Sequence, residues 1–451
     1  MTRIQSLKIS VSGIRGIVGE TLTPQLLTAF AGAFGTYMGR GPILVGRDTR
    51  FSGDMVCNAV FAGLLSAGCE PVDLGICPVP SIQIRAAEGR ARGAIAVTAS
   101  HNPAEWNALK FIGRQGLFLN SNQAEELLDI YHQRSFTQVG AAEIGRICSD
   151  DGAIEGHLER LLDYFDRSLV RRARLKVVVD SCNGAGSLAA PRFLQKLGCS
   201  VVELNTNPAG GFPRNPEPIP ENLDELCRAV RRHHADIGLA QDADADRLAI
   251  VDAGGNPIGE EYTLALAVLF VLEKSKGPVV ANISTTRAID DIAERHGCPV
   301  IRSKVGEINV VEEMIQNGAV VGGEGNGGVI LPPIHHCRDS MSGMGAVLQL
   351  MAERKKPVSG ILAGLPRYFM IKDKVVFLAD GLAALHSALK KSFRDAEQQT
   401  LDGLKLSWKD SWLLVRLSNT EPVLRIVAEA GSARQARSLI GEVKRIVREN
   451  R

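Results

Sequence analysis

The sequence lacks the patterns that mark secreted and membrane proteins. Its nine cysteines are scattered from Cys57 to Cys337 without a Cys-x-x-Cys pair, so reduced thiols in the core are expected. The N-terminal segment MTRIQSLKIS has no continuous apolar stretch before a small-residue cleavage site, so no secretory signal is expected. The longest apolar run, Leu264 to Leu272, is too short to span a bilayer. A cytoplasmic protein without a membrane partner is therefore expected.

The chain also lacks an excess of either charge and any short repeat. Its formal net charge is only +2, with acids and bases interspersed, so the overall charge does not predict nucleic-acid binding, and any anion site must be local. The 451 residues exceed the roughly 250 to 300 at which one core stops growing, which predicts three or four domains. With 45% hydrophobic and 23% charged residues, the chain has ample apolar surface to bury.

Short Val- and Ile-rich runs, Gly or Asn turns and longer amphipathic segments alternate in three successive regions of the chain. This alternation predicts α/β domains, and the later change to short alternating strands predicts a smaller α+β domain with amphipathic segments at 382–398 and 433–448. The Pro-rich segment from Asn207 to Asn222 is expected to be a rigid connection. The predicted domains cover residues 1–150, 151–255, 256–365 and 366–451.

The sharpest chemical signal is Gln241-Asp-Ala-Asp-Ala-Asp-Arg247, between two predicted buried strands. The period of two predicts that Asp242, Asp244 and Asp246 share one face of an extended chain, where three carboxylates are costly unless a cation neutralises them. Hard oxygen ligands suit Mg²⁺. A calcium loop of the EF-hand type would need Gly and Glu where this chain has Arg247 and Ala253, which excludes it. A solvated acidic turn is the remaining alternative.

Thr98-Ala-Ser-His-Asn-Pro103 follows the apolar run GAIAV, which predicts that Ser100 lies in the loop after a buried strand, where α/β active sites lie. Neither Thr98 nor Asn102 is the Gly of a hydrolase elbow, so a Ser-His-Asp esterase is disfavoured. A phosphoryl group on Ser100 would instead have its oxygens neutralised by the nearby metal. His101 is disfavoured as a direct base because successive extended side chains point apart. A capped loop before a helix is the structural alternative.

Three further segments carry charged or polar groups. Lys110 could neutralise phosphate or, with a lowered pKa, accept a proton, and a surface lysine is the alternative. The segment from Gly322 to Gly328, GGEGNGG, surrounds one acid and one amide with flexible backbone, which suits sugar hydroxyls or a simple turn. The segment RLSNTEPVLR puts Arg416 and Arg425 on adjacent strand ends, which predicts a phosphate cradle or a hairpin with surface arginines.

Together these motifs resemble those of the α-D-phosphohexomutase family, in the family's order and over essentially the whole chain. TASHNP is similar to the phosphoserine loop, DADADR to the metal loop, GEGNGG to the sugar-recognition loop and RLSNTEPVLR to the phosphate-binding loop of a mobile last domain. SGIRG around Arg15 and GRDTR around Arg47 are supporting matches. The resemblance implies an α/β fold of four domains around a central active-site cleft, three related α/β domains with mixed sheets and a smaller C-terminal α+β domain.

The resemblance also implies an activity, the interconversion of a hexose 6-phosphate and a hexose 1-phosphate through phosphorylated Ser100 and a hexose 1,6-bisphosphate, with Mg²⁺ as cofactor. Ser100, Asp242, Asp244 and Asp246 would hold the metal. Lys110 and Arg247 would assist proton or charge transfer, Arg15 would contact the phosphoserine, and His101 is grouped with them as the neighbour of Ser100. The expected substrate-binding residues are Glu324, Asn326, Arg416, Ser418, Asn419, Thr420 and Arg425.

Two departures from the family pattern stand out. Gly328 occupies a position where many members have a histidine, and His335, His336 and Arg338 are candidates to compensate. Ala108 replaces a glycine that is usual after the Asn of the serine loop. The GEGNGG variant is most similar to archaeal-type phosphoglucosamine mutases, which favours glucosamine phosphate as the substrate.

Alternatives to that function stay open at this point. Within the enzyme class they are a phosphomannomutase or phosphoglucomutase and a metal-dependent phosphatase. Outside it, the alternative is a non-catalytic sugar-phosphate-binding protein, which would have no need for Ser100 beside three aspartates. The expected partner is a small hexose phosphate, bound by a monomer or a homodimer.

Overall fold

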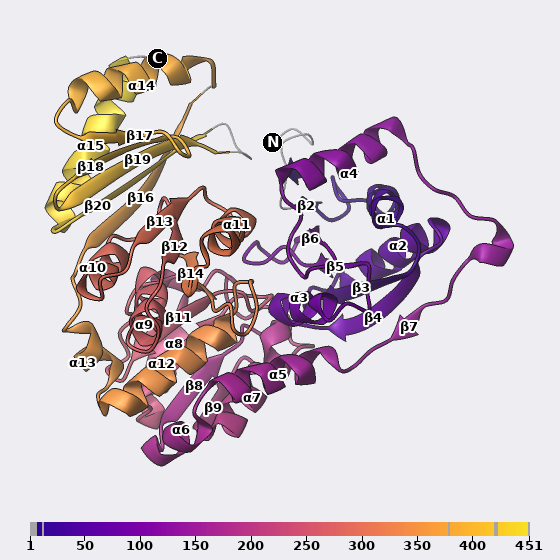
Figure 1. The fold of residues 1–451 in the computed structure, drawn as a ribbon, viewed down its shortest axis with the longest axis horizontal. Helices are drawn as coiled ribbons and strands as arrows, with labels where there is room; N and C mark the ends of the chain where they lie inside the picture. The colour runs from indigo at the N-terminus through magenta and orange to yellow at the C-terminus, as the bar shows by residue number, and fades with distance from the viewer. Residues whose placement is uncertain (1–6, 11–12, 378, 419–422, 450–451) are drawn as a thin grey trace.

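The computed structural model describes residues 7–10, 13–377, 379–418 and 423–449, which form four domains, each around its own sheet (Figure 1). In each of the first three domains, four strands have the spatial order 2-1-3-4, in which the first three are parallel and the fourth is antiparallel. This shared unit confirms the predicted three related α/β domains with mixed sheets.

The strands of the shared unit are short, buried and rich in Val and Ile, as expected for strands covered on both faces. In domain I they are β3 (Pro42–Arg47), β4 (Glu70–Ile76), β5 (Gly93–Val97) and β6 (Trp106–Ile112). In domain II they are β8 (Lys176–Asp180), β9 (Ser200–Leu204), β10 (Ile237–Gln241) and β11 (Leu248–Asp252). In domain III they are β12 (Val279–Asn282), β13 (Val300–Ser303), β14 (Val321–Glu324) and β15 (Gly328–Ile330). Domain I adds β1 (Lys8–Ser10), β2 (Gly13–Ile17) and β7 (Cys148–Ser149) at its edges.

Helices cover these sheets. Those of domain I are α1 (Pro24–Met38), α2 (Gly53–Ser66), α3 (Val79–Ala87) and α4 (Ser121–Gln133), followed by the 3₁₀ turn η2 (Ala141–Glu143). Those of domain II are α5 (Ala153–Tyr164), α6 (Arg167–Ala173), α7 (Ala190–Leu197) and α8 (Asp224–His233), with η3 (Ala185–Leu188) and η4 (Pro220–Asn222). Those of domain III are α9 (Glu261–Leu272), α10 (Ala288–Arg295), α11 (Glu307–Asn317), α12 (Ser340–Arg354) and α13 (Val358–Leu362).

Domain IV is the predicted α+β domain. Its antiparallel sheet has the order β16-β20-β19-β18-β17, and α14 and α15 pack on one face of it. The predicted helical segment 382–398 is too long, because the helix ends at Ser392 and the chain then forms a strand. The elements are β16 (Phe369–Val376), η5 (Ala379–Gly381), α14 (Leu382–Ser392), β17 (Glu397–Gln399), β18 (Leu404–Trp408), β19 (Ser411–Leu417), β20 (Val423–Ala430) and α15 (Ala433–Glu449).

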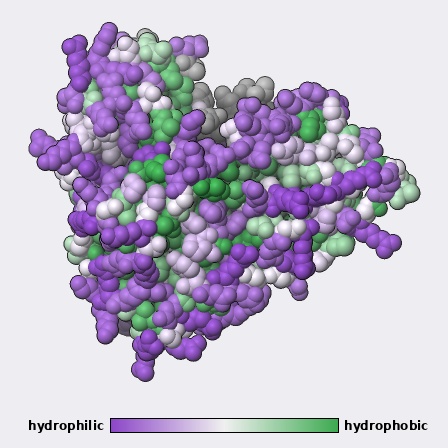
Figure 2. Space-filling model, viewed as in Figure 1, coloured by the Kyte–Doolittle hydropathy of each residue, from purple (hydrophilic) through white to green (hydrophobic). Residues whose placement is uncertain are grey.

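The core places domains II and III in contact. One continuous apolar cluster joins Phe165 and Phe193 of domain II to Phe270 and Met344 of domain III, and α9 is buried on all sides within it. Domains I and IV have separate cores of their own. The surface is mainly hydrophilic and is hollowed between domains IV and I (Figure 2). No helix in the described part of the chain is both long and apolar enough to cross a membrane. The domain boundaries predicted at 150, 255 and 365 stay predictions.

Candidate active site

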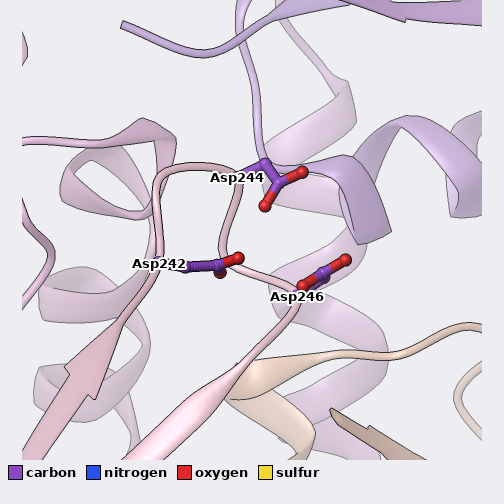
Figure 3. A group of neighbouring side chains, drawn as sticks. All are labelled: Asp242, Asp244 and Asp246. Atoms are coloured by element: carbon purple, nitrogen blue, oxygen red, sulfur yellow. The ribbon is translucent and has the colours of Figure 1, made fainter. Parts of the chain in front are cut away.

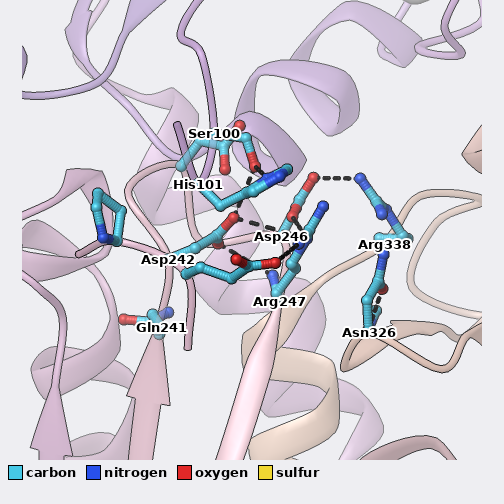
Figure 4. A network of polar contacts seen from close by, with 12 residues as sticks. Ser100, His101, Gln241, Asp242, Asp246, Arg247, Asn326 and Arg338 are labelled. Carbon is cyan, nitrogen blue, oxygen red and sulfur yellow. Dashed lines mark hydrogen bonds and ion pairs between the residues drawn. The ribbon is translucent and has the colours of Figure 1, made fainter. Parts of the chain in front are cut away.

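The same turn of each α/β unit contributes to one polar centre. This turn joins the third strand to the fourth, at the carboxyl end of the parallel strands, and it carries Ser100 in domain I, the three aspartates in domain II and Gly325 to Gly327 in domain III. The hydroxyl of Ser100 donates to Asp242 Oδ2 at 2.8 Å, and Arg338 of domain III donates to Asp246 Oδ2 at 2.6 Å (Figure 4). Side chains of three domains therefore meet at the turn that carries the three aspartates, residues 242–246, which is called the metal turn below.

Ser100 is held in a left-handed conformation with φ of +50°, which is uncommon for a serine and costs on the order of 1 kcal/mol or more. Arg50, which is buried, offsets this cost by donating to the carbonyl oxygens of Ser100 and Asn102, both at 2.8 Å. Asp48 orients Arg50 through an ion pair at 2.9 Å. Arg50 belongs to the predicted GRDTR match, but Arg47 of that match instead pairs with Asp54 at the start of α2.

The structure corrects the prediction that His101 points away from Ser100. The distance between His101 Nδ1 and Ser100 Oγ is 3.3 Å, because the left-handed turn at Ser100 replaces the extended backbone on which the prediction relied. The nearby Arg247 cation, together with burial, lowers the pKa of His101 well below its ordinary value. The imidazole is therefore neutral at physiological pH and a weak base. A helix after this segment is also excluded, since β6 follows it.

Asp242, Asp244 and Asp246 come together, although the backbone between them is a turn and not the predicted extended chain (Figure 3). Ala245 has a left-handed φ of +61°, which reverses the chain and brings one oxygen of each carboxylate within 4.8 Å of the others. Burial, then the charges of Asp244 and Asp246, raises the pKa of Asp242 well above its ordinary value. Among the described residues, the Oδ1 atoms of Asp244 and Asp246 are buried without a hydrogen-bond partner. Such a donor set fits a hard divalent cation.

Two basic residues surround the carboxylates. Lys110 on β6 donates to Asp244 Oδ2 at 2.7 Å and lies 3.8 Å from Asp246 Oδ2. Burial alone would lower the pKa of Lys110, but the neighbouring carboxylates outweigh it and the pKa is raised, which favours the charge-neutralising alternative over the proton-accepting one. The Nε atom of Arg247 lies 3.8 Å from Asp246 Oδ1, and its backbone N–H donates to Asp242 Oδ1 at 3.2 Å.

A cavity of about 50 Å³ adjoins the Ser100 hydroxyl, and Arg15, Lys110 and Ala108 are among the residues that line it. Arg15 on β2 donates to the side-chain oxygen of Asn102 at 3.4 Å. The cavity therefore lies beside Ser100 and two basic residues, whose charges favour an anion in this region of the site.

Glu324 and Asn326 of the glycine-rich turn differ in how many hydrogen bonds they already make within the protein. Glu324 is 3% exposed, and its carboxylate accepts from Asn282 at 2.7 Å, from Gly306 N at 2.9 Å and from Arg338 at 2.6 Å. Burial raises and Arg338 lowers the pKa of Glu324, with a net lowering. Asn326 is half-buried and accepts from Gly328 N at 3.3 Å. Glu324 is therefore a charged group with most of its acceptor positions already used.

The three candidates to compensate for the missing histidine at Gly328 can now be separated. His335 contacts Gly116 O of domain I at 3.2 Å, and burial lowers its pKa to about 4. His336 is half-buried, and no described polar contact joins it to the site. Arg338 lies directly against Gly328 and contacts the metal turn. Arg338 is therefore the residue that occupies this part of the site.

Domain IV carries the predicted phosphate cradle on its β19–β20 hairpin. Arg416 and Arg425 are directly opposite in register, so two like charges face each other across the strands. Ser418 N donates to Val423 O at 2.9 Å and closes the hairpin. Asn419 and Thr420 lie outside the described residues. In Figure 1, this hairpin projects from domain IV toward the space between domains IV and I.

Comparison with known proteins identifies the relatives of this chain. Residues 6–138, 155–255 and 259–369 match α/β/α domains I, II and III of phosphoglucomutase/phosphomannomutase, and residues 374–446 match the C-terminal domain. The chain belongs to the phosphoglucomutase/phosphomannomutase family. This phosphohexomutase is accordingly an isomerase.

Relatives of this phosphohexomutase match it over nearly its full length. A phosphoglucomutase/phosphomannomutase of Thermococcus kodakarensis is 38% identical over 95% of both chains. A protein of Methanopyrus kandleri named "Probable phosphoglucosamine mutase" is 37% identical over 97% of both chains. The crystal structure of a phosphoglucomutase/phosphomannomutase family protein from Burkholderia thailandensis has a TM-score of 0.83 at 28% identity, covering 98% of each chain.

Sequence reasoning missed several polar residues of this phosphohexomutase's site. Asp48 and Arg50 belong to the GRDTR motif, but nothing in its spacing shows that Arg50, and not Arg47, points into the protein. Glu307 and Gln83 form a hydrogen bond at 3.1 Å across domains III and I, and neither lies near a recognisable motif. Only the fold brings these residues to the site.

Proposed function

We propose that this family member transfers a phosphoryl group between the 6- and 1-positions of a hexose through phosphorylated Ser100, and that its substrate is glucosamine 6-phosphate. One observation carries the proposal. The Ser100 hydroxyl donates to Asp242, within a cluster of three buried carboxylates and beside a cavity lined by Arg15 and Lys110. A phosphoryl group on Ser100 would thus have cations next to it, as phosphoryl transfer requires.

The metal proposal rests on the carboxylates themselves. Asp242, Asp244 and Asp246 would hold Mg²⁺ together with an oxygen of phosphorylated Ser100, and this assignment is supported by the Oδ1 atoms of Asp244 and Asp246, which are buried without a hydrogen-bond partner among the described residues. Mg²⁺ would supply charge neutralisation for the phosphoryl oxygens during transfer. Arg15 would contact the phosphoserine from the cavity.

In the reaction, the bond between phosphorus and Ser100 Oγ breaks as a bond to a sugar hydroxyl oxygen forms. Lys110, which the carboxylates keep protonated, can give the proton that Ser100 Oγ takes up. The proton that the sugar hydroxyl loses would pass to His101, which is neutral; its lowered pKa makes it a weak base, so this transfer would accompany formation of the phosphorus–oxygen bond. Arg247 would contribute positive charge beside Asp246.

The product of that step is a hexose 1,6-bisphosphate, which reorients and returns its other phosphate to Ser100. Throughout, the phosphate that is not reacting would bind to domain IV, where Arg416 and Arg425 face each other. Ser418, Asn419 and Thr420 would add donors to it. Glu324 and Asn326 would contact the sugar hydroxyls.

The choice of sugar separates two candidates. The GEGNGG turn and the relatives named phosphoglucosamine mutase support glucosamine phosphate. The Thermococcus kodakarensis relative supports glucose or mannose phosphate instead. Comparing kcat/KM for glucosamine, glucose and mannose 6-phosphates decides between them, and a preference for glucosamine 6-phosphate of less than about tenfold, roughly 1.4 kcal/mol, would contradict our choice.

The phosphoserine is tested by intact mass and by Ser100→Ala. Purified protein should contain a fraction heavier by one phosphoryl group, which maps to Ser100, and Ser100→Ala should lose both this fraction and mutase turnover, by on the order of 10⁴-fold or more. Ser359→Ala is the matched control, because Ser359 is an exposed residue of α13. Mutase activity of Ser100→Ala near the wild-type level, or net release of phosphate without isomerisation, would refute the proposal.

We further propose that the protein acts in the cytoplasm on small hexose phosphates, as a monomer or homodimer. All nine cysteines are free thiols, eight of them buried, which supports a reducing compartment. Light scattering at several protein concentrations would establish the oligomeric state.

A further inference from the structure

Arg338 contacts three carboxylates with three different nitrogen atoms. Its Nε donates to Glu307 Oε2 at 3.0 Å, its Nη1 to Glu324 Oε2 at 2.6 Å and its Nη2 to Asp246 Oδ2 at 2.6 Å. The side chain is only 10% exposed. A planar guanidinium with donors in fixed directions can hold three carboxylates at once, whereas an ammonium group is a single point charge.

Contacts on both sides fix the position of this guanidinium. Glu307 accepts from Gln83 of domain I at 3.1 Å, so the Nε end of Arg338 is tied to a second domain. Two residues along the chain, Ser340 accepts from Gln241 at 2.7 Å and donates to Ala245 O at 2.6 Å. The backbone after Arg338 is therefore attached to the metal turn itself.

Gly328 is explained by the same side chain. A Cβ atom at residue 328 would lie 2.3 Å from Cδ and 3.0 Å from Cγ of Arg338, well inside van der Waals contact. The backbone of Gly328 does not have a positive φ, so the backbone conformation alone would accept other residues. The glycine is required because the stem of Arg338 occupies the space of a side chain.

The contacts of Arg338 determine which oxygens of Asp246 and Glu324 can still accept another partner. Arg338 engages Asp246 through Oδ2 and leaves the buried Oδ1 without a hydrogen-bond partner among the described residues. A carboxylate offers about four acceptor positions, and Asn282, Gly306 and Arg338 use three of those of Glu324. One acceptor position on Glu324 Oε2 then remains for a sugar hydroxyl.

We infer that Arg338 is a positioning and specificity-determining residue, which joins the sugar loop to the metal turn and which takes the place of a side chain at residue 328. It acts through its two hydrogen-bond acceptors: it orients Asp246 toward the metal and Glu324 toward the sugar. A side chain with a permanent charge thus occupies the space that a Cβ atom at residue 328 would need. The roles of sugar and metal rest on the proposed function, but the pairing of Gly328 with Arg338 does not.

The pairing is tested by a double-mutant cycle on stability, which needs no substrate. Gly328→Ala should lower the denaturation midpoint in the wild-type background and should have little further effect in the Arg338→Ala background, because the colliding stem is then absent. Gly431→Ala is the matched control, since no atom lies near a Cβ at that position. Equal losses from Gly328→Ala in both backgrounds would overturn the pairing.

The positioning role is tested with Mn²⁺ as the probe, by electron paramagnetic resonance on substrate-free protein. Arg338→Lys keeps the positive charge but loses the fixed donor directions of the guanidinium, so Asp246 should no longer be held toward the metal and Mn²⁺ binding should weaken by about tenfold. Arg338→Gln also removes one positive charge beside the carboxylates, so its Mn²⁺ affinity should be higher than that of Arg338→Lys. Mn²⁺ binding by Arg338→Lys equal to that of the wild type overturns the positioning role.

Steady-state kinetics supplies the specificity readout. Arg338→Lys should raise the KM for hexose 6-phosphate by about tenfold with a smaller change in kcat, because the ammonium group does not orient Glu324. An unchanged KM in Arg338→Lys contradicts the specificity role. If the wild type itself has no mutase activity, the proposed function fails, while the stability cycle and Mn²⁺ binding still decide the role of Arg338.

Discussion

Single side chains in this site owe their protonation to neighbours that are distant in the sequence. Lys110 keeps its proton because Asp244, which is in another domain, lies 2.7 Å away. His101 is neutral mainly because of Arg247, which is also in domain II. Proximity in space thus decides between the two alternatives that the sequence left open for Lys110, and it corrects the predicted orientation of His101.

Glu261 gives a pH prediction at this scale. It is buried against Gly325 of the sugar loop, and burial, partly offset by Lys372, raises its pKa from 4.5 to about 7. Between those values the folded protein keeps a proton that the unfolded chain has lost, so stability falls as pH rises. The unfolding free energy of the wild type, measured against Glu261→Gln, should fall by up to about 1.4 kcal/mol per pH unit from pH 5 to 7. Parallel stability curves for the two proteins would contradict this.

At the scale of elements, the same turn position carries a different set of groups in each domain. The turn between the third and fourth strands of the unit carries Ser100 in domain I, the three carboxylates in domain II and Gly325 to Gly327 in domain III. These turns can converge because each leaves the carboxyl end of parallel strands, where the sheet edge is open. Arg50 and Arg338 then fix the first and third turns from outside them.

In the β19–β20 hairpin, we expect the cations that would bind phosphate to lower the stability of the free protein. Arg416 and Arg425 are opposite each other, and Lys374 on β16 is opposite Arg425, so three cations form one row across the sheet. Without an anion, like charges in such pairs destabilise the sheet. Arg425→Ala should therefore raise the unfolding free energy by about 0.2 to 1 kcal/mol in phosphate-free buffer while it raises the KM for hexose phosphate about tenfold.

Urea unfolding and steady-state kinetics measure the two effects of Arg425→Ala. Arg437→Ala on α15 is the control, since Arg437 is exposed on the helix that covers the other face of the sheet. If the KM of Arg425→Ala equals that of the wild type, Arg425 does not bind the phosphate of the substrate.

At the scale of the whole molecule, a buried chain of hydrogen bonds joins the first three domains. Ser81 of domain I contacts His157 Nδ1 at 2.9 Å, and His157 Nε2 of domain II contacts Asp339 of domain III at 3.2 Å. All three residues are buried, so the arrangement is an interdomain clamp and not a hydrolytic triad open to substrate. Asp339 also caps α12 next to Arg338.

Replacing His157 should loosen this clamp. His157→Ala leaves the buried Asp339 without its imidazole partner and should destabilise the protein by about 3 kcal/mol, with domain I unfolding as a separate transition. Scanning calorimetry measures both effects, with His132→Ala on the exposed face of α4 as the control. A single transition at the wild-type temperature would show that the clamp does not couple the domains.

The sequence was sufficient for what is encoded locally. Alternating apolar runs predicted the α/β domains, and the density of like charge in DADADR predicted a cation site, because both signals depend only on nearby residues. The four motifs also identified the family, which the domain matches confirm. The domain boundaries and the roles of Asn419 and Thr420 stay predictions.

The tertiary structure decided which groups complete the site. Arg50, Glu307 and Gln83 are far from one another in the sequence, and Arg338 was only one of three candidates. Ion pairs in a protein interior form between residues that folding brings together, and their energy depends on burial and direction, neither of which can be obtained from spacing along the chain. The sequence by itself predicted Ser100 and three aspartates as the groups for phosphoryl chemistry, and the fold determined which cations contact them.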